Sequence, residues 1–432
     1  MNWLRRLDSC AVSAASLDYA NENAVLTCKE LGVPLLSEAH RDISSLLAWV
    51  ERADIVLIHF WNHPLLYDFL VRNPLPPARV VFWAHASGFH PPYIFPEKIL
   101  NYADKFVFTT PASFFAKEIE SYPRKDKLSA ILSTSGVERF ATLQKKPHDE
   151  FNIGYVGTVD YAKMHPDFLK MCASIHIPNV KFIVISNDSQ ETLKRAASET
   201  GMADKFYFAG KVADVWPWLE VFDVFGYPLN PNHYGTAEQV LQEAMAAGVV
   251  PVVLDNRAER GVLGECGVIA KDTDDYARKI EALYNDDEAR IALGEKAREY
   301  ALSKFTSGAL FSAWDAVLAD VVTAEKHPRH WVSDRAEPLS HYEIFLESLG
   351  KYAKVTENLK EMANSPLWMS RSKGTPFQYA EFFPEDRELA RLCHELLRPA
   401  QSPHIYAPPI MLLYALIHLL IPSFLRSFIA YH

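Results

Sequence analysis

The feature that most constrains this chain is a repeated alternation of short apolar runs and helix-compatible segments between about residues 50 and 320. Residues 54–59, 79–85 and 105–109 are rich in β-branched and aromatic residues without polar alternation, which is typical of strands covered on both faces of a parallel sheet. A loop rich in proline, glycine or serine follows each run. The pattern predicts βα units and an α/β fold.

A second series of such units follows a charged, proline-containing linker at residues 144–149. We therefore expect a first Rossmann-like domain over residues 1–145 and a second over residues 150–325, which face each other across a cleft. Ligands of open parallel sheets bind at the carboxyl ends of the strands, so the cleft is the expected site. The second series of runs comprises residues 153–157, 181–186, 205–209, 223–227 and 249–254.

The rest of the chain reads differently. Residues 274–324 are dominated by helix formers, and residues 328–432 contain no further βα series, which predicts a mainly helical appendage of unknown role. Within it, residues 365–375 read as a loop. Residues 410–421 form an apolar run shorter than the roughly 20 residues that cross a bilayer. A buried terminal helix is favoured there over a peripheral membrane anchor.

Composition excludes several classes of protein. The 432 residues are 49% apolar and 23% charged, as in a folded chain of two or three domains. The net charge of 44 − 54 = −10 argues against nucleic-acid binding, which needs a basic face. The five scattered cysteines and the polar first twenty residues indicate a cytoplasmic protein without a secretory signal.

The most informative stretch is residues 223–253. A strand leads into a proline-rich loop that closes at Gly235, and we expect a helix to begin there, with Thr236 as N-cap and Gln239 completing a capping box. The free N–H groups at such a helix end suit a phosphate or a sugar oxygen, with Glu238 and Glu243 close by. The alternative is an ordinary helix in which Glu238 simply favours the amino end and Glu243 is a solvated helix residue.

In this stretch the sequence resembles the family-four glycosyltransferases, which are retaining enzymes of the two-domain GT-B type. Their donor-site signature contains a Glu, seven intervening residues, and then Glu-Ala-Met-Ala-x-Gly before a short strand. The resemblance covers about residues 50–320 and keeps its order along the chain. The matching segments are Glu243–Gly248, Pro251–Val253, Gly157–Lys163, Ser135–Phe140 and Val212–Pro228.

The resemblance implies transfer of a sugar, with retention of configuration, from a nucleotide-diphosphate sugar to a glycan, lipid-linked or small-molecule acceptor. No cofactor is implied, and no cluster at metal-ligand spacing is evident, so metal independence is expected. The chain departs from the family at two positions. Gly235 stands where the first signature Glu is expected, with Glu238 as the candidate replacement, and Thr158 replaces an arginine that usually partners Lys163 on the diphosphate.

The resemblance also suggests roles for individual residues. His85, Lys163 and Glu238 are the expected catalytic residues, and Glu243 is expected to hold the ribose hydroxyls. His59 and His63, beside an earlier strand end, are interpreted as structural. The full expected donor-binding set is Gly157, Thr158, Lys163, His233, Tyr234, Gly235, Thr236, Glu238 and Glu243.

Three other functions stay open at this point. A nicotinamide oxidoreductase is disfavoured because no Gly-x-Gly-x-x-Gly follows a strand. A GT-B sugar epimerase or phosphorylase shares the expected architecture. The non-enzymatic alternative is a degenerate transferase that acts as a binding or scaffold subunit.

Overall fold

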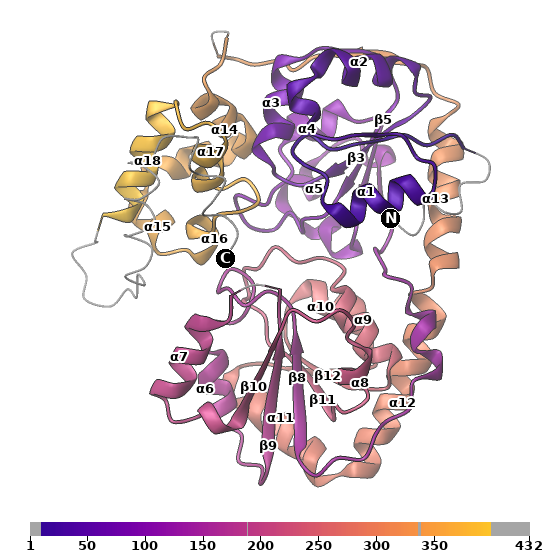
Figure 1. Cartoon of the computed structure of the whole chain (residues 1–432). Helices are drawn as coiled ribbons and strands as arrows, with labels where there is room; N and C mark the ends of the chain where they lie inside the picture. Colours follow the sequence, from indigo (N-terminus) through magenta and orange to yellow (C-terminus); the bar gives the residue numbers. More distant parts are fainter. Residues whose placement is uncertain (1–9, 188, 336–337, 399–432) are drawn as a thin grey trace.

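The computed structural model describes residues 10–187, 189–335 and 338–398, and it contains two parallel sheets (Figure 1). The first sheet has the order β3-β5-β6-β7, and its strands pair in parallel throughout. Buried aliphatic and aromatic side chains fill β5, whose five residues are all buried. The strands are β3 (Val56–Phe60), β5 (Val80–Ala84), β6 (Lys105–Phe108) and β7 (Leu128–Ala130).

Helices and short strand pairs surround the first sheet. The pair β1–β2 is parallel, and β4 pairs antiparallel with β14. The helices are α1 (Glu22–Glu30), α2 (Ile43–Arg52), α3 (Pro64–Arg72), α4 (Glu97–Tyr102) and α5 (Lys117–Ser121), and the short strands are β1 (Ala14–Ala15), β2 (Leu35–Leu36), β4 (Leu75–Ala78) and β14 (His327–Arg329).

The second sheet has the order β10-β9-β8-β11-β12-β13 and is also parallel. From the centre, the chain builds outward through β9 and β10 in one direction and through β12 and β13 in the other. The neighbours β8 and β11 therefore form a topological switch point, the place at which open parallel sheets generally bind their ligands. The strands are β8 (Phe151–Val156), β9 (Val180–Ile185), β10 (Phe206–Gly210), β11 (Val224–Tyr227), β12 (Val250–Leu254) and β13 (Val268–Ala270).

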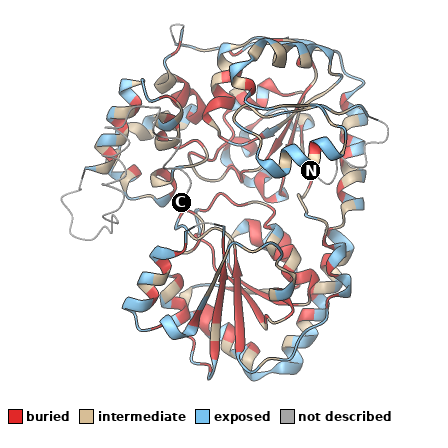
Figure 2. Cartoon of the chain, in the orientation of Figure 1, coloured by how far each residue is buried: buried red, intermediate tan, exposed pale blue. Residues whose placement is uncertain are grey.

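Helices cover the second sheet, whose strands are largely buried in Figure 2. The predicted helical character of residues 274–324 is confirmed, because three helices with aspartate or threonine N-caps occupy most of it. The helices that follow β8 are α6 (Phe168–Ala173), α7 (Glu191–Glu199), α8 (Trp216–Leu219), α9 (Gln239–Ala246), α10 (Arg257–Leu263), α11 (Thr273–Asn285), α12 (Asp287–Lys304) and α13 (Ser307–Val321).

The helix α13 returns to the first sheet, alongside which it runs in Figure 1. Its buried Trp314 lies 4.9 Å from Trp83 of β5, measured between ring centroids, in an edge-to-face arrangement. Leu310, Val317 and Val321 join this cluster. One face of the first sheet is therefore covered by a helix that is distant in sequence.

The predicted C-terminal helices are confirmed. They pack beside α3, and Phe345, Leu349 and Leu389 are buried in the core of the first sheet. The helices are α14 (His341–Leu349), α15 (Leu359–Ala363), α16 (Pro366–Met369), α17 (Pro376–Phe382) and α18 (Arg387–Leu397). The apolar run 410–421 lies outside the described residues. Among the described helices, none combines the length and the apolar character that a bilayer crossing requires.

Candidate functional site

The candidate site lies at the switch point of the second sheet. The loop after β8 carries Gly157, Thr158 and Lys163, and the loop after β11 runs to the start of α9. An isolated bridge between Met164 and Leu229 and a hydrogen bond from the Asn230 N–H to the Lys163 carbonyl, 2.8 Å long, join the two loops. The backbone thus brings together two segments that are about seventy residues apart in the sequence.

The centre of the site is an ion pair between Lys163 and Glu238. The Lys163 Nζ lies 3.0 Å from Glu238 Oε2, and the two side chains are 16% and 2% exposed. The Tyr227 hydroxyl donates a 2.7 Å hydrogen bond to the same oxygen. Burial raises the pKa of Glu238, but Lys163, His233 and Tyr227 lower it further, so its pKa lies below the usual value. Burial lowers the pKa of Lys163, but Glu238 raises it above its usual value, so both groups are charged at neutral pH.

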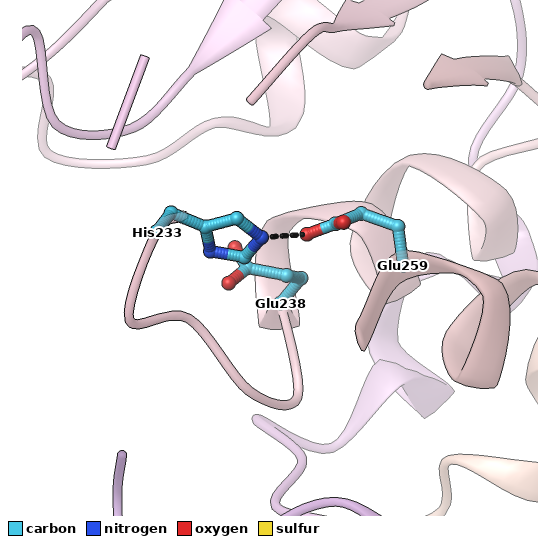
Figure 3. A group of neighbouring side chains, drawn as sticks. All are labelled: His233, Glu238 and Glu259. Carbon is cyan, nitrogen blue, oxygen red and sulfur yellow. Dashed lines mark ion pairs between the residues drawn. The ribbon is translucent and has the colours of Figure 1, made fainter. Parts of the chain in front are cut away.

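A second carboxylate, that of Glu259, is linked to this ion pair by His233. The His233 Nε2 lies 3.0 Å from Glu259 Oε1 of α10, and the Gly235 N–H donates a 2.8 Å hydrogen bond to His233 Nδ1 (Figure 3). This pattern assigns the ring proton to Nε2. Both side chains are buried. The sequence analysis missed Glu259, because the segment that carries it reads as an ordinary charged helix start.

Gly235 is a glycine because the Glu238 carboxylate occupies the place of its side chain. A Cβ at position 235 would lie 1.9 Å from Glu238 Oε1 and 2.7 Å from His233 Nδ1. Both distances are too short for atoms that are not bonded to each other. Glu238 takes up a left-handed backbone conformation with φ of 39°. The Glu238 carboxylate therefore lies directly beside Gly235, the position at which the resemblance expects a glutamate.

The predicted capping box at Thr236 is wrong. The helix α9 begins at Gln239, its N-cap residue is Glu238, and no side chain makes a cap hydrogen bond there. The physical reason is the left-handed turn at Glu238, which aims that carboxylate at Gly235 and keeps the backbone of Thr236 outside the helix. Thr236 is half-buried in the turn before α9.

The structure reveals a group of potential metal ligands that sequence spacing did not show. His233, Glu238 and Glu259 each offer one ligand atom, and these atoms lie within 4.8 Å of one another. The Lys163 ammonium is already bound to Glu238 in this group, and His233 Nε2 lies 3.0 Å from Glu259 Oε1.

The predicted Glu243 lies one turn further along α9. The Ser135 hydroxyl donates a 2.7 Å hydrogen bond to Glu243 Oε1, which links α9 to the segment between the two sheets. Burial raises the pKa of Glu243, and the bond from Ser135 partly opposes this rise. In the loop after β8, the Thr158 carbonyl accepts a 2.7 Å hydrogen bond from the Tyr155 hydroxyl, and Gly157 N–H donates to the Ile185 carbonyl at 3.0 Å.

Tyr234 connects this site with the first sheet. Its carbonyl accepts a 3.2 Å hydrogen bond from the Ser87 N–H, and its buried ring lies 5.1 Å from that of Tyr93. Burial raises the pKa of Tyr234 to about 12. The turn that carries His233 and Glu238 therefore faces the first sheet rather than open solvent.

His85 lies on that facing side, at the end of β5, and pairs with His59. Nε2 of His85 lies 3.0 Å from Nδ1 of His59, and Trp61 stacks on the His85 ring at 5.1 Å. His59 is exposed to solvent, and the rings of His85 and Trp83 pack against its ring. Burial lowers the pKa of His85 to about 3 and that of His59 to about 4, so both rings are neutral. His63 caps α3 through its ring nitrogen.

Comparison with known proteins agrees with this architecture. The family model described as "Glycosyl transferases group 1" matches residues 138–300, the segment that carries the second sheet and its site. LpsE of Rhizobium meliloti (strain 1021), a lipopolysaccharide core biosynthesis glycosyltransferase, is 22% identical over 278 residues, which are 59% of this chain and 79% of LpsE. EpsD of Bacillus subtilis (strain 168), which is assigned as a glycosyltransferase, is 27% identical over 161 residues; the match covers 36% of this chain and 42% of EpsD, less than half of its length.

Two solved structures share the two-sheet fold. Anabaena HepE in complex with UDP-glucose has a TM-score of 0.57 at 14% identity, with 71% of this chain and 91% of HepE covered. The sucrose-phosphate synthase of Thermosynechococcus elongatus has a TM-score of 0.53 at 17% identity, with 66% and 78% covered. The expected GT-B fold is confirmed. The segment that carries the second sheet and its site is therefore similar to the group 1 glycosyl transferases.

Proposed function

We propose that the chain transfers a sugar from a UDP-sugar donor to an acceptor hydroxyl with retention of anomeric configuration. The observation that carries this proposal is the buried Lys163–Glu238 pair at the switch point, beside the N-terminus of α9. UDP-glucose is the ligand of HepE, whose fold is similar. The uridine and diphosphate moieties would lie on the second sheet, and the acceptor would approach from the first sheet.

The chemistry of transfer fits the charges of the site. In retaining transfer the donor sugar passes through an oxocarbenium-like state while negative charge grows on the departing diphosphate. In this proposal, Lys163 and the N–H groups at the start of α9 stabilise that charge, and one such donor is worth about 3 kcal/mol of barrier. Because the diphosphate itself can take the acceptor's proton, no nucleophile of the chain is needed.

Each remaining residue has a proposed role. Glu243 binds the ribose hydroxyls, and Glu238 orients the donor sugar from the place that position 235 would otherwise fill. His233 holds Glu238 and Gly235 in position with the help of Glu259. His85, neutral at physiological pH, accepts a hydrogen bond from a sugar hydroxyl at the boundary between the sheets.

The acceptor class is proposed from the relatives. LpsE acts in lipopolysaccharide core biosynthesis by name, so a glycan or a lipid-linked saccharide is the proposed acceptor. The proposed place of action is the cytoplasm, where nucleotide sugars are available. A peripheral contact with the membrane through residues 410–421 remains part of this proposal, since a lipid-linked acceptor would be presented there.

The test is turnover of UDP-sugars by the full chain. We expect wild-type protein to release UDP from one member of a UDP-sugar panel, with and without EDTA, and nuclear magnetic resonance of the product to show retained configuration. Lys163→Ala and Glu243→Ala should each lower kcat/KM by at least about 100-fold, because each removes a donor contact. Lys170→Ala, at an exposed lysine of α6, is the matched control and should turn over normally.

The outcomes separate the alternatives. If wild-type protein neither binds nor turns over any UDP-sugar, the chain is a scaffold and the proposal is overturned. If it converts a UDP-sugar without an acceptor to its epimer, the epimerase alternative is correct. Circular dichroism and thermal melting of both variants show whether lost turnover reflects lost folding.

A further inference from the structure

The C-terminal helices reach the candidate site through the loop between α16 and α17. Gly374 of this loop, with φ of 88°, packs so closely on the first sheet that a Cβ would lie 2.2 Å from the Asn62 carbonyl oxygen. The Gly374 N–H donates to Gln378 Oε1 at 2.7 Å, and the Thr375 hydroxyl donates to the Ser370 carbonyl at 2.7 Å. The loop therefore packs against the segment that follows β3.

This anchoring places Lys373 between the two sheets. Its Nζ lies 3.2 Å from the centroid of the Tyr234 ring and 4.9 Å from that of Trp61. Tyr234 belongs to the turn that carries Glu238, whereas Trp61 lies beside His85. Lys373 itself has a left-handed φ of 58°, which a residue with a side chain adopts only where its surroundings hold it.

Tyr234 also relates Lys373 to Lys163. After burial, the charge of Lys163 is the strongest influence on the pKa of Tyr234, and Thr158 also lowers this pKa from nearby. The two ammonium groups therefore act on one side chain, Lys373 over its ring and Lys163 from within the second sheet. Thr158, the neutral residue that stands where the resemblance expects an arginine, lies at the same phenol.

The charge balance of the site calls for an additional cation. A diphosphate brings at least two negative charges, but the charge of Lys163 is already opposed by Glu238, and the buried Glu259 adds another carboxylate. Desolvated anions require positive charge close by. Lys373 brings such a charge from outside the second sheet.

We propose that Lys373 is a donor-binding residue, and that the C-terminal helices serve to hold its ammonium against the diphosphate of the nucleotide, opposite Lys163. This inference rests on the proposed function and extends it, because it assigns part of the donor site to the region after residue 328. The chemistry recognised is a nucleoside diphosphate. The aromatic rings of Tyr234 and Trp61 hold the ammonium in place until phosphate oxygens replace part of that interaction.

The experiment is calorimetric titration of the full chain with UDP and, separately, with uridine, which lacks the phosphates. Lys373→Met should weaken UDP binding by about 10- to 100-fold and leave uridine binding unchanged, because only charge-assisted contacts to phosphate are lost. Lys373→Arg, which keeps the charge, should stay within about threefold of wild type. Lys360→Met, at an exposed lysine of α15, is the control for loss of one positive charge and should bind UDP normally.

A second variant tests position rather than charge. Gly374→Ala should move the loop away from Asn62 while Lys373 is retained. We expect this variant to bind UDP more weakly than wild type, as Lys373→Met does. Wild-type UDP affinity in Lys373→Met overturns the inference while leaving the proposed function intact. Normal UDP affinity with a raised acceptor KM alone assigns Lys373 to the acceptor and also overturns it. If the wild-type chain does not bind UDP at all, the proposed function fails, and this inference fails with it.

Discussion

At the scale of single residues, the site is organised around a carboxylate that comes from an unexpected position. Glu238 fills the space beside Gly235 and binds Lys163 from there. Had position 235 carried a side chain, Glu238 would have been displaced and Lys163 would have lost its partner. The glycine and the glutamate are therefore two parts of one arrangement, and neither can change alone without cost.

This arrangement predicts a rescue. Glu238→Ala should lower kcat/KM by at least about 100-fold, because it removes a contact to the donor sugar and leaves Lys163 unpaired. The double variant Gly235→Glu, Glu238→Ala returns a carboxylate to the same space and should recover about tenfold of that loss. Gly308→Ala in α13, where a Cβ would meet only Thr306 at 3.9 Å, is the control for a tolerated substitution. If kcat/KM of the double variant were no higher than that of Glu238→Ala, the position of the carboxylate would not explain the activity.

The histidine pair predicts how stability depends on pH. The pKa values of His59 and His85 in the fold are about 4 and about 3, against 6.5 for an unperturbed ring. Below pH 6.5 the unfolded chain binds protons that the folded chain does not, so the free energy of unfolding falls as the pH drops from 6.5 toward 4. Thermal melting at pH 7 and pH 5 measures this. His85→Gln should show a smaller decrease in Tm than wild type, and an equal decrease would contradict the assignment.

At the scale of elements, the sequence predicted the sheets well because buried parallel strands leave a simple signature. Residues 54–59 and 79–85 were expected as strands and form β3 and β5. Local signals failed at the start of α9, where the Thr–x–x–Gln pattern predicted a cap that a left-handed turn at Glu238 overrides. They also failed for Glu259 and Lys373, whose importance depends on neighbours that are distant in sequence.

The packing of α13 on the first sheet gives a prediction about stability. Trp314 is 3% exposed and contacts Trp83, so Trp314→Ala should reduce the free energy of unfolding by about 3–5 kcal/mol through lost burial and a cavity. Denaturant unfolding measures the change. Ile291→Ala, at an isoleucine of α12 that is 63% exposed, should have little effect. A Trp314→Ala variant as stable as wild type would show that this helix is not part of the core.

At the scale of the whole molecule, the site is assembled from segments that are far apart in the chain. In the proposed site, His85 comes from the first sheet, Lys163 and Glu238 come from the second, and Lys373 lies between them in the loop before α17. The sequence singled out the first three through motifs in strand-end loops, and their roles stay predictions. The sequence suggested no role for the C-terminal region, because the role proposed for Lys373 depends on the aromatic rings that it contacts in the fold.

The C-terminal helices also predict the outcome of truncation. Phe345 and Leu349 of α14 are buried beside α3, so a chain that ends at residue 330 would expose to water the apolar side chains of α3 that these helices cover. We expect the truncated chain to aggregate or to bind a hydrophobic dye strongly, whereas the full chain should not. Dye fluorescence and size-exclusion chromatography test this. A monomeric truncated chain without dye binding would show that the first sheet does not depend on these helices.

The docking of α14–α18 onto the first sheet also bears on how the protein matures in a cell. A ribosome makes the first sheet early, but the helices that cover its α3 side emerge only after the second sheet has been translated. The first sheet of the nascent polypeptide therefore stays partly uncovered until the C-terminal helices have been synthesised. The uncovered α3 side of the first sheet is therefore the surface that a chaperone would bind during synthesis.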